Sequence, residues 1–264
     1  MKYDLSALKQ IIISAARDEL LPRFADVQRD TKMDGSFVTA ADIAVQTRIT
    51  KALSEAYPNT ALLGEEMTAQ QQAQLLSESE SLWCLDPLDG TSNFAAGTPY
   101  YAISLALIER GVATLGIVYD PNRDECFVAI RGKGAWLNDE PLNVKAVELP
   151  LAQCTALIDF KRLPARLAMD LVAQRPYGSQ RSYGSVALDW CWMAASRFHV
   201  YLHGASSLWD YSAGLLIFNE AGGCSSTLEG DDIYVNELSK RSSVAALDKV
   251  TFDQWSTWLK QQRD

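Results

Sequence analysis

The 264-residue chain lacks an excess of positive charge: 33 aspartates and glutamates outnumber 24 lysines and arginines, and the net charge is -9. Nonspecific binding to nucleic acid or to an anionic membrane needs a basic surface, so this deficit argues against both partners. No apolar run approaches membrane-spanning length, and the first residues, MKYDLSALKQ, lack a signal-peptide pattern. We therefore expect a cytoplasmic protein without a nucleic-acid or membrane partner.

Cysteine and histidine are also scarce. The five cysteines include no CxxC pair, which leaves no obvious disulfide framework or cysteine zinc site, and we expect them to be reduced core residues. The two histidines, His199 and His203, lie four residues apart in a predicted strand. That spacing separates them by about 13 Å, so they are not expected to share a zinc ion.

Repeats are absent as well, and the apolar pattern changes once along the chain, after Leu149-Pro150. Before this point the pattern predicts helices at 5–24 and 40–56, strands at 60–63 and 82–85, and an antiparallel meander between 101 and 144. After it, the pattern predicts strands at 155–159, 198–202 and 242–247 and helices at 164–174, 185–196, 211–221 and a last one capped by Thr251. The sequence thus predicts a mixed α/β (α+β) protein in which helices cover two sheets. Its subdomains, 1–147 and 148–264, are expected to form one continuous unit.

The segment LDPLDGTSNF places two aspartates, Asp86 and Asp89, directly after a predicted buried strand. In the simplest interpretation, Asp86 starts a turn and Asp89 caps a helix. However, two carboxylates about 5 Å apart repel by roughly 3 kcal/mol at an effective dielectric near 20, and Mg²⁺ bound between them removes that repulsion. The backbone N–H groups of Gly90, Thr91 and Ser92 would bind an anion at a helix start. The combination indicates phosphoryl chemistry.

Three further segments carry acidic residues in comparable places, and each has an ordinary alternative. The glutamates of GEE (64–66) follow a predicted strand, but a surface pair would look the same. Asp210 stands at the start of an apolar helix, where it would serve as an N-cap. VTAAD (38–42) has the pattern of a capping box, with Thr39 as cap and Asp42 three residues later. None of these segments decides the function alone.

Taken together, these segments resemble the inositol monophosphatase family in order and spacing. The matching segments are GEE (64–66), DPLDGTSNF (86–94) and WDYSAGLLIFNEAGG (209–223), with VTAAD (38–42), RSYGSVA (181–187) and RGKGAWLND (131–139) as minor motifs. The resemblance covers nearly the whole chain. It implies a layered αβαβα sandwich of the inositol monophosphatase and fructose-1,6-bisphosphatase type. It also implies a Mg²⁺-dependent, lithium-sensitive phosphomonoesterase, usually a homodimer.

The resemblance also implies a metal site for two to three Mg²⁺ ions. Glu65, Asp86 and the carbonyl of Leu88 would bind the first ion, and Asp86, Asp89 and Asp210 the second. Glu65 would help to hold a third ion through water. Two Mg²⁺ ions would neutralise the four carboxylates, so that a phosphate dianion could bind to an acidic chain.

The same resemblance implies the remaining catalytic roles. Thr91 would orient the attacking water, Asp42 would accept a hydrogen bond from the Thr91 hydroxyl, and Glu65 would act with them through the metal site. The backbone amides of Gly90 and Thr91 would hold the phosphate. One metal ion would supply hydroxide and another would stabilise the leaving alkoxide. Attack would be in line, without a covalent enzyme intermediate.

Substrate contacts are implied on the alcohol side of the pocket. Asp89 and Asp210 reach it from the metal site, and the family segment that lines it corresponds here to Gly184, Ser185 and Val186. Members that act on inositol phosphates carry a glutamate seven residues before the aspartate of the WD motif, where this chain has His203. Neutral imidazole binds a hydroxyl but does not replace a carboxylate that accepts from paired hydroxyls.

The expected function is therefore hydrolysis of a small phosphorylated metabolite, as in an inositol monophosphatase. The alternative substrates are histidinol phosphate, fructose 1,6-bisphosphate and phosphoadenosine phosphate. Phosphoadenosine phosphatases usually read TKEF where this chain has TSNF (91–94), which disfavours the last of these. Two other classes of function also remain open: an additional nonenzymatic role, since some relatives bind transcription machinery, and a purely structural metal site.

Overall fold

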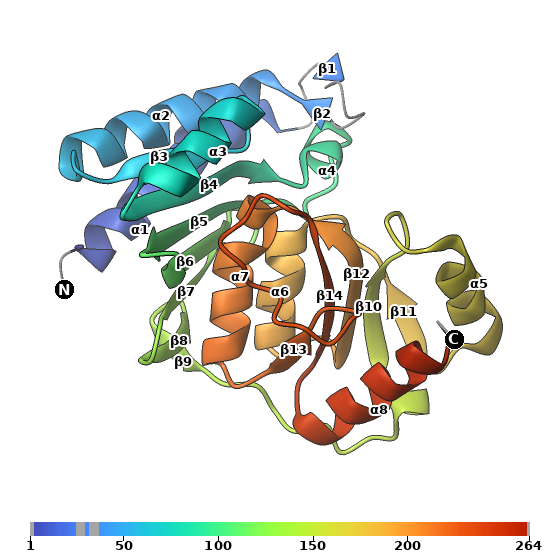
Figure 1. The fold of residues 1–264 in the computed structure, drawn as a ribbon. Coiled ribbons are helices and arrows are strands. Elements are labelled where there is room, and N and C mark those ends of the chain that lie inside the picture. Colours follow the sequence, from blue (N-terminus) through green and yellow to red (C-terminus); the bar gives the residue numbers. More distant parts are fainter. Residues whose placement is uncertain (1–2, 25–29, 32–36, 263–264) are drawn as a thin grey trace.

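Two β-sheets form the framework of the computed structural model, which describes residues 3–24, 30–31 and 37–262 (Figure 1). The larger sheet has seven strands in the order β3-β4-β5-β6-β7-β8-β9, and the smaller has five in the order β11-β10-β12-β14-β13. Strands β3 and β4 are parallel, β4 is antiparallel to β5, and β5 to β9 form the predicted antiparallel meander. In the smaller sheet β10 is parallel to both of its neighbours, whereas β14 is antiparallel to β12 and β13.

The strands alternate with helices after residue 150, as the sequence predicts. The strands of the larger sheet are β3 (Ala61–Gly64), β4 (Ser81–Asp89), β5 (Ala102–Glu109), β6 (Val112–Asp120), β7 (Glu125–Ile130), β8 (Gly134–Leu137) and β9 (Glu140–Leu142). Those of the smaller sheet are β10 (Thr155–Asp159), β11 (Ser179–Arg181), β12 (Val200–Ser206), β13 (Cys224–Ser226) and β14 (Arg241–Ala246). The helices are α1 (Leu5–Ala15), α2 (Ala40–Ala56), α3 (Ala69–Glu78), α4 (Thr91–Ala95), α5 (Ala165–Gln174), α6 (Val186–Ala194), α7 (Leu208–Glu220) and α8 (Lys249–Gln261). A short ribbon of β1 (Asp30–Thr31) and β2 (Phe37–Val38) lies outside both sheets.

Three apolar cores divide the fold into five layers. Helices α1 and α2 pack on one face of the larger sheet, around the buried Trp83. Helices α6 and α7 lie between the two sheets (Figure 1). Trp190 and Phe218 fill the central core there. Helices α5 and α8 cover the outer face of the smaller sheet through Leu171 and Trp255. This αβαβα order confirms the predicted sandwich.

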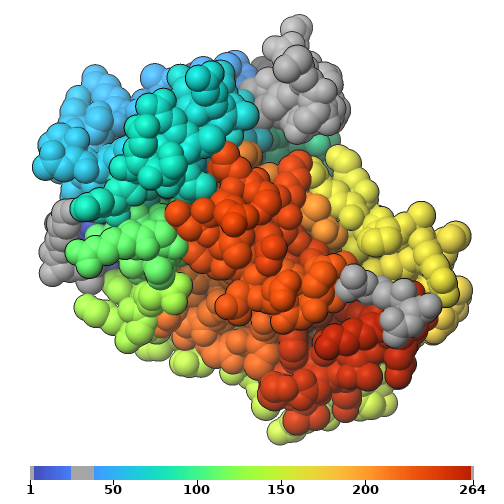
Figure 2. Space-filling model, in the orientation of Figure 1, coloured from blue at the N-terminus to red at the C-terminus, as the bar shows by residue number. Residues whose placement is uncertain are grey.

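The segment between β13 and β14 covers part of the central layer. Ile233 is buried in the central core, and Leu75 of α3 packs against the same core. In Figure 2 this segment, orange-red, lies at the centre of the visible face between α3, in turquoise, and the red α8. It ends at Lys240, directly before β14, and so carries that lysine to the cavity described below.

The predicted boundaries differ from the structure at two helix ends. The helix predicted at 5–24 is α-helical only to Ala15 and continues as a π-helical turn (Ala16–Leu20) and a 3₁₀ turn (Leu21–Arg23). Pro22 lies in the 3₁₀ turn, where it lacks an N–H group and so cannot donate an α-helical hydrogen bond. The last helix is capped by Asp248, which accepts from the N–H of Thr251 at 2.8 Å, and not by Thr251 itself.

The cysteines confirm the expectation drawn from their scarcity. All five are free thiols, and four of them are buried. Within the described ranges, every helix is too short or too polar to cross a lipid bilayer. The division into subdomains 1–147 and 148–264 stays a prediction, since α6 and α7 pack in a core that both sheets share.

Strand β6 and helix α7 approach closely at Gly116. A Cβ atom there would lie 2.8 Å from the carbonyl oxygen of Ala213 and 3.0 Å from its Cα. We expect Gly116→Ala to lower the free energy of unfolding by about 2 kcal/mol, because overpacking forces the backbone of α7 away from the sheet. Urea unfolding measures this change. The control is Val112→Ala, at the exposed start of the same strand, which should cost about 0.5 kcal/mol. Equal stability of the two variants would contradict the close packing.

Candidate active site

The parallel pairing of β3 and β4 brings two acidic segments to one edge of the larger sheet. Gly64 lies opposite Leu85 in the register, and the N–H of Glu65 donates to the carbonyl of Leu85 at 3.1 Å. Glu65 therefore follows β3 at the level where Asp86 follows Leu85. Ligands of sheets with parallel strands bind outside the carboxyl ends of those strands. The two acids lie at such a place.

The sequence predicts that strand β4 ends at Leu85, before the aspartates. In the structure β4 continues to Asp89. Two residues three apart in a regular strand point to opposite faces. Here the register with β5 shifts: Asp86 pairs with Ser104 and Asp89 with Ala102, so one residue of β4 is extra. This bulge, between Asp86 and Asp89, returns both aspartates to one cavity. The cap of α4 is Gly90, so Asp89 is not a helix cap.

Asp210 joins this pair from the first turn of α7. The helix begins at Leu208 and is capped by Ser207, so Asp210 is its third residue and not the predicted N-cap. The N–H of Ser207 donates to Asp210 Oδ2 at 2.8 Å. Ser104, the partner of Asp86 in the sheet, donates its hydroxyl to the carbonyl of Trp209 at 3.2 Å. This bond holds the start of α7 beside the bulge.

The segment before α6 fixes Asp89. The Ser185 hydroxyl and the Ala187 N–H donate to Asp89 Oδ2 at 2.7 and 2.6 Å. Ser185 is fully buried and holds this carboxylate, whereas its neighbours Gly184 and Val186 line the cavity. Asn93 ties the same segment to α4, because its amide donates to the carbonyl of Tyr183 at 2.6 Å. Asn93 of the TSNF motif is thus a positioning residue.

Thr91 and Asp42 lie in contact, as the resemblance implies. The Thr91 hydroxyl is 3.1 Å from Asp42 Oδ1 and 3.0 Å from the carbonyl oxygen of Leu88. Asp42 Oδ2 accepts from the N–H and the hydroxyl of Thr39 at 2.8 and 2.6 Å, which is the predicted capping box of α2. The capping box fixes one oxygen of the carboxylate and presents the other to Thr91.

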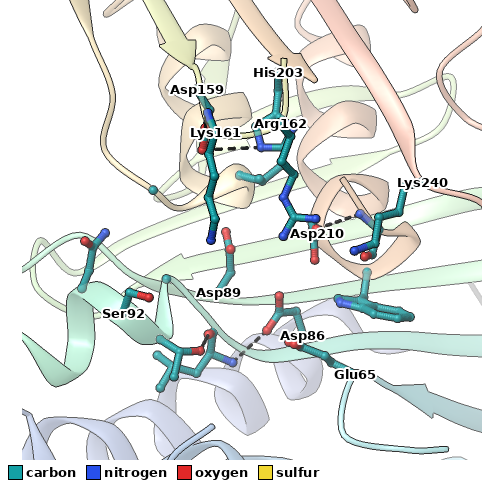
Figure 3. Close-up of a pocket in the computed structure, with 18 residues that line it drawn as sticks. Glu65, Asp86, Asp89, Ser92, Asp159, Lys161, Arg162, His203, Asp210 and Lys240 are labelled. Carbon is teal, nitrogen blue, oxygen red and sulfur yellow. Dashed lines mark hydrogen bonds and ion pairs between the residues drawn. The ribbon is translucent and has the colours of Figure 1, made fainter. Parts of the chain in front are cut away.

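These residues surround a cavity of about 340 Å³. Figure 3 shows acidic side chains on the side of the larger sheet and basic side chains that reach in from the side of the smaller sheet. The described residues that line it are Glu65, Asp86, Leu88, Asp89, Gly90, Thr91, Ser92, Asn93, Asp159, Lys161, Arg162, Gly184, Val186, His203, Ser207, Trp209, Asp210 and Lys240. Asp42 and Ser185 are the predicted site residues outside this lining, and both bind residues within it.

The acidic side chains of the cavity oppose one another's ionisation. Burial raises the pKa of Asp86 well above its usual value, and the charges of Glu65, Asp89 and Asp210 raise it further. Burial likewise raises the pKa of Asp210, with Asp89 and Glu65 adding to the effect. Burial also raises the pKa of Asp89 to about 6, although hydrogen bonds from Ser185 and Ala187 partly offset it. A cation bound among these groups would reverse all three shifts.

The donor set fits a hard divalent cation. Asp86 Oδ1 accepts from the Leu88 N–H at 3.0 Å, and Asp210 Oδ2 accepts from the Ser207 N–H at 2.8 Å. Within the described ranges, the second carboxylate oxygen of each aspartate accepts no hydrogen bond. Carboxylate and carbonyl oxygens are the ligands that Mg²⁺ prefers. No three His, Cys, Asp or Glu side chains of the described chain are already close enough to form a complete metal-binding group.

His203 lies on the opposite wall, beside an acid that the sequence did not single out. The register pairs His203 of β12 with Asp159 of β10, and His203 Nε2 is 3.7 Å from Asp159 Oδ2. His203 Nδ1 accepts from the N–H of Ala205 at 3.3 Å. Burial lowers the pKa of His203 to about 4 despite the charge of Asp159. The imidazole is thus neutral at pH 7, with its proton on Nε2.

Comparison with known proteins places these observations in a family. Residues 3–258 match the model of the inositol monophosphatase family. The chain is 35% identical over 229 residues to the Nus factor SuhB of Pasteurella multocida, covering 85% of this chain and 83% of that protein. It is 31% identical to an inositol-1-monophosphatase of Mesorhizobium japonicum, covering 92% and 97%. The crystal structure of the extragenic suppressor protein suhB of Bartonella henselae superposes with a TM-score of 0.85 at 29% identity, covering 97% and 98%. The chain belongs to the inositol monophosphatase family.

Proposed function

We propose that this protein is a Mg²⁺-dependent phosphomonoesterase that hydrolyses a small phosphorylated metabolite by attack of an activated water. The observation that carries the proposal is the meeting of acidic side chains from three separate parts of the chain in one cavity, next to the Thr91–Asp42 hydrogen bond. A structural metal site would not need such a pair, because a hydroxyl held by a carboxylate serves to orient a reactant.

The proposed metal ligands are Glu65, Asp86, the Leu88 carbonyl, Asp89 and Asp210, for two to three ions. The bound ions would activate a water molecule and stabilise the charge of the leaving group. The chain itself keeps these ligands in place: the bulge of β4 aligns Asp86 with Asp89, Ser185 holds Asp89, and Ser207 holds Asp210.

Thr91 and Asp42 would act on the attacking water. The Thr91 hydroxyl has one proton and two acceptors, Asp42 Oδ1 and the Leu88 carbonyl, so its oxygen is left to accept a hydrogen bond from water. Gly90, which has a φ of 94°, allows the chain to turn at the end of β4. The backbone amides of Gly90 and Thr91 would then hold the phosphate.

A phosphate-release assay with and without Mg²⁺ tests the proposal. We expect hydrolysis of inositol 1-phosphate and of an aryl phosphate in Mg²⁺, loss of both in EDTA, and inhibition by Li⁺. Hydrolysis that persists in EDTA would contradict the metal dependence. Absence of hydrolysis over a panel of monoesters, with Mg²⁺ bound in calorimetry, would instead support a structural metal site.

The prediction for His203 concerns substrate choice. His203→Glu alone would place a carboxylate beside Asp159, so we combine it with Asp159→Asn. The double variant should raise kcat/KM for inositol monophosphate, relative to an aryl phosphate, by about tenfold, because a carboxylate accepts charge-assisted hydrogen bonds from paired hydroxyls. Asp159→Asn alone is the control. An unchanged ratio between the two substrates would place His203 outside the specificity pocket.

A nonenzymatic role is the second candidate, because the relatives from Pasteurella multocida and Neisseria meningitidis are named Nus factor or putative Nus factor. The net charge of -9 still argues against nonspecific binding to nucleic acid. Complementation separates the two functions. If the cell needs catalysis, the wild-type gene should rescue cells that lack it and the Asp89→Asn variant should not. If the cell needs only the nonenzymatic role, both genes should rescue.

A further inference from the structure

Three basic side chains line the cavity on the wall opposite the carboxylates: Lys161, Arg162 and Lys240. This is unexpected in a chain with a net charge of -9. Other basic side chains of the described ranges form ion pairs with acids, for example Lys249 with Asp253. In the described part of the chain, none of the three has an acidic oxygen within 4.0 Å. No ion pair therefore prevents the three from binding a ligand, although the charge of Arg162 lowers the pKa of Asp210.

The backbone that carries Lys161 and Arg162 is held rigidly over the cavity. The turn after β10 is closed by the Lys161 N–H, which donates to Asp159 Oδ1 at 2.7 Å. Gly204 of β12 lies under this turn, where a Cβ atom would be 1.9 Å from the carbonyl oxygen of Arg162. Only glycine permits this approach. The turn is therefore packed against the smaller sheet.

The side chains of this turn point into the cavity. In Figure 3, Lys161 and Arg162 extend from the side of the smaller sheet toward Asp89 and Asp210. A second cavity, of about 460 Å³, adjoins the first and shares Arg162 and Lys240 with it. Arg162 and Lys240 thus lie between the two cavities. The part of a substrate beyond its scissile phosphate would extend toward these two cations.

We infer that the substrate carries a second anionic group, a phosphate or a carboxylate, which Lys161, Arg162 and Lys240 bind while the acidic side of the cavity binds the scissile phosphate. This inference rests on the proposed phosphomonoesterase function and narrows its substrate. A guanidinium binds carboxylate or phosphate through paired hydrogen bonds, and two lysines add point charges. Inositol monophosphate, which has only hydroxyls beyond its phosphate, leaves these cations without a partner.

Two matched pairs of substrates test the inference and distinguish the two anions. Fructose 1-phosphate against fructose 1,6-bisphosphate adds a phosphate, and glycerol 3-phosphate against 3-phosphoglycerate adds a carboxylate. In wild type, kcat/KM should be at least about tenfold higher for the member with the second anionic group in at least one pair. The pair that shows the preference identifies the second anion.

Variants then assign the preference to the three cations. Arg162→Gln and Lys240→Gln should each remove most of the preference, because each lowers kcat/KM more for the member that carries the second anionic group than for its partner. Arg166→Gln is the control, because Arg166 lies on the exposed first turn of α5 and faces Asp170 at 3.9 Å. It should retain the full preference.

The competing explanation is that these cations only balance the carboxylates. In that case Arg162→Gln would change both members of a pair equally and would lower the melting temperature of the metal-free protein. The inference would be overturned if Arg162→Gln changed kcat/KM equally for both members of a pair, or if wild type showed no preference. In either case, hydrolysis of an aryl phosphate in Mg²⁺ would leave the proposed function intact. Failure to hydrolyse any of the phosphates would overturn both.

Discussion

Asp89→Asn is expected to reduce kcat for phosphate release to less than about one thousandth of the wild-type value while the fold stays intact. The asparagine oxygen can still accept from the Ser185 hydroxyl and the Ala187 N–H, which bind one oxygen of Asp89 in wild type. What is lost is the negative charge toward the cavity, and with it the ligand of the second metal ion. The variant thus separates metal binding from packing.

The measurement combines kcat at saturating Mg²⁺ with calorimetric titration of Mg²⁺. Asp170→Asn, a change on the exterior helix α5, is the control for the loss of one carboxylate and should leave both values unchanged. Full activity of purified Asp89→Asn would end the assignment of this residue as a metal ligand. Reduced activity with unchanged Mg²⁺ binding would give it a role in substrate binding instead.

The same variant should be more stable than wild type when metal is absent. Burial raises the pKa of Asp89 to about 6 in the folded protein, above its usual value of 3.8, so ionisation of this group costs folding free energy. This cost is absent below about pH 4, increases between about pH 4 and 6, and reaches its full value above about pH 6. Melting temperatures in EDTA should therefore be higher for Asp89→Asn at pH 8 and equal at pH 4. A lower melting temperature of the variant at pH 8 would contradict this account.

Part of the site could be predicted because its residues lie in contiguous motifs. Asp86, Asp89 and Asp210 all stand at ends of elements that the apolar pattern marks. The spacing of Asp86 and Asp89 alone, however, points them to opposite faces of a strand. Only the pairing of β4 with β5, which absorbs one residue in a bulge, brings them to the same cavity. Such a bulge depends on a partner strand and leaves no local signal beyond Pro87.

The opposite wall of the site could not be predicted in this way. Asp159 reaches His203 only through the register of β10 and β12, and the two are 44 residues apart in the chain. Lys161 and Arg162 look like ordinary surface residues of a turn, and Lys240 like the end of a loop. Nothing in their immediate sequence indicates a cavity. What places them is the stacking of the smaller sheet against the central helices, a tertiary effect.

The layer order of the fold was easier to predict than its element boundaries. The family resemblance covers the whole sandwich, whereas each boundary depends on one or two side chains. Ser207 rather than Asp210 caps α7, and this moves Asp210 from a cap into the first turn, where the capping box uses only one of its oxygens. A local pattern indicates that a helix begins near Asp210. It does not decide which of two polar residues, three positions apart, caps the helix.

Thr91→Ala is expected to lower kcat by about 10² to 10⁴ and to leave Mg²⁺ affinity near that of wild type. The methyl group cannot accept a hydrogen bond from the attacking water, whereas the Leu88 carbonyl, a proposed metal ligand, only loses its contact with the Thr91 hydroxyl at 3.0 Å. Stability should fall by only about 1 kcal/mol, the usual value for one hydrogen bond. Helix capping does not enter, because α4 is capped by Gly90.

Thr91→Ser and Asp42→Asn show whether the hydroxyl acts together with Asp42. Thr91→Ser retains the hydroxyl and should keep most of kcat. Asp42→Asn should lower kcat, because the amide no longer offers a carboxylate to Thr91 at 3.1 Å, although one oxygen of the side chain can still accept from Thr39. If Thr91 and Asp42 orient the water as a unit, the double variant Thr91→Ala, Asp42→Asn should be no slower than the worse single variant. Fully additive losses would mean that the two residues act separately, and a change confined to KM would mean that Thr91 only binds phosphate.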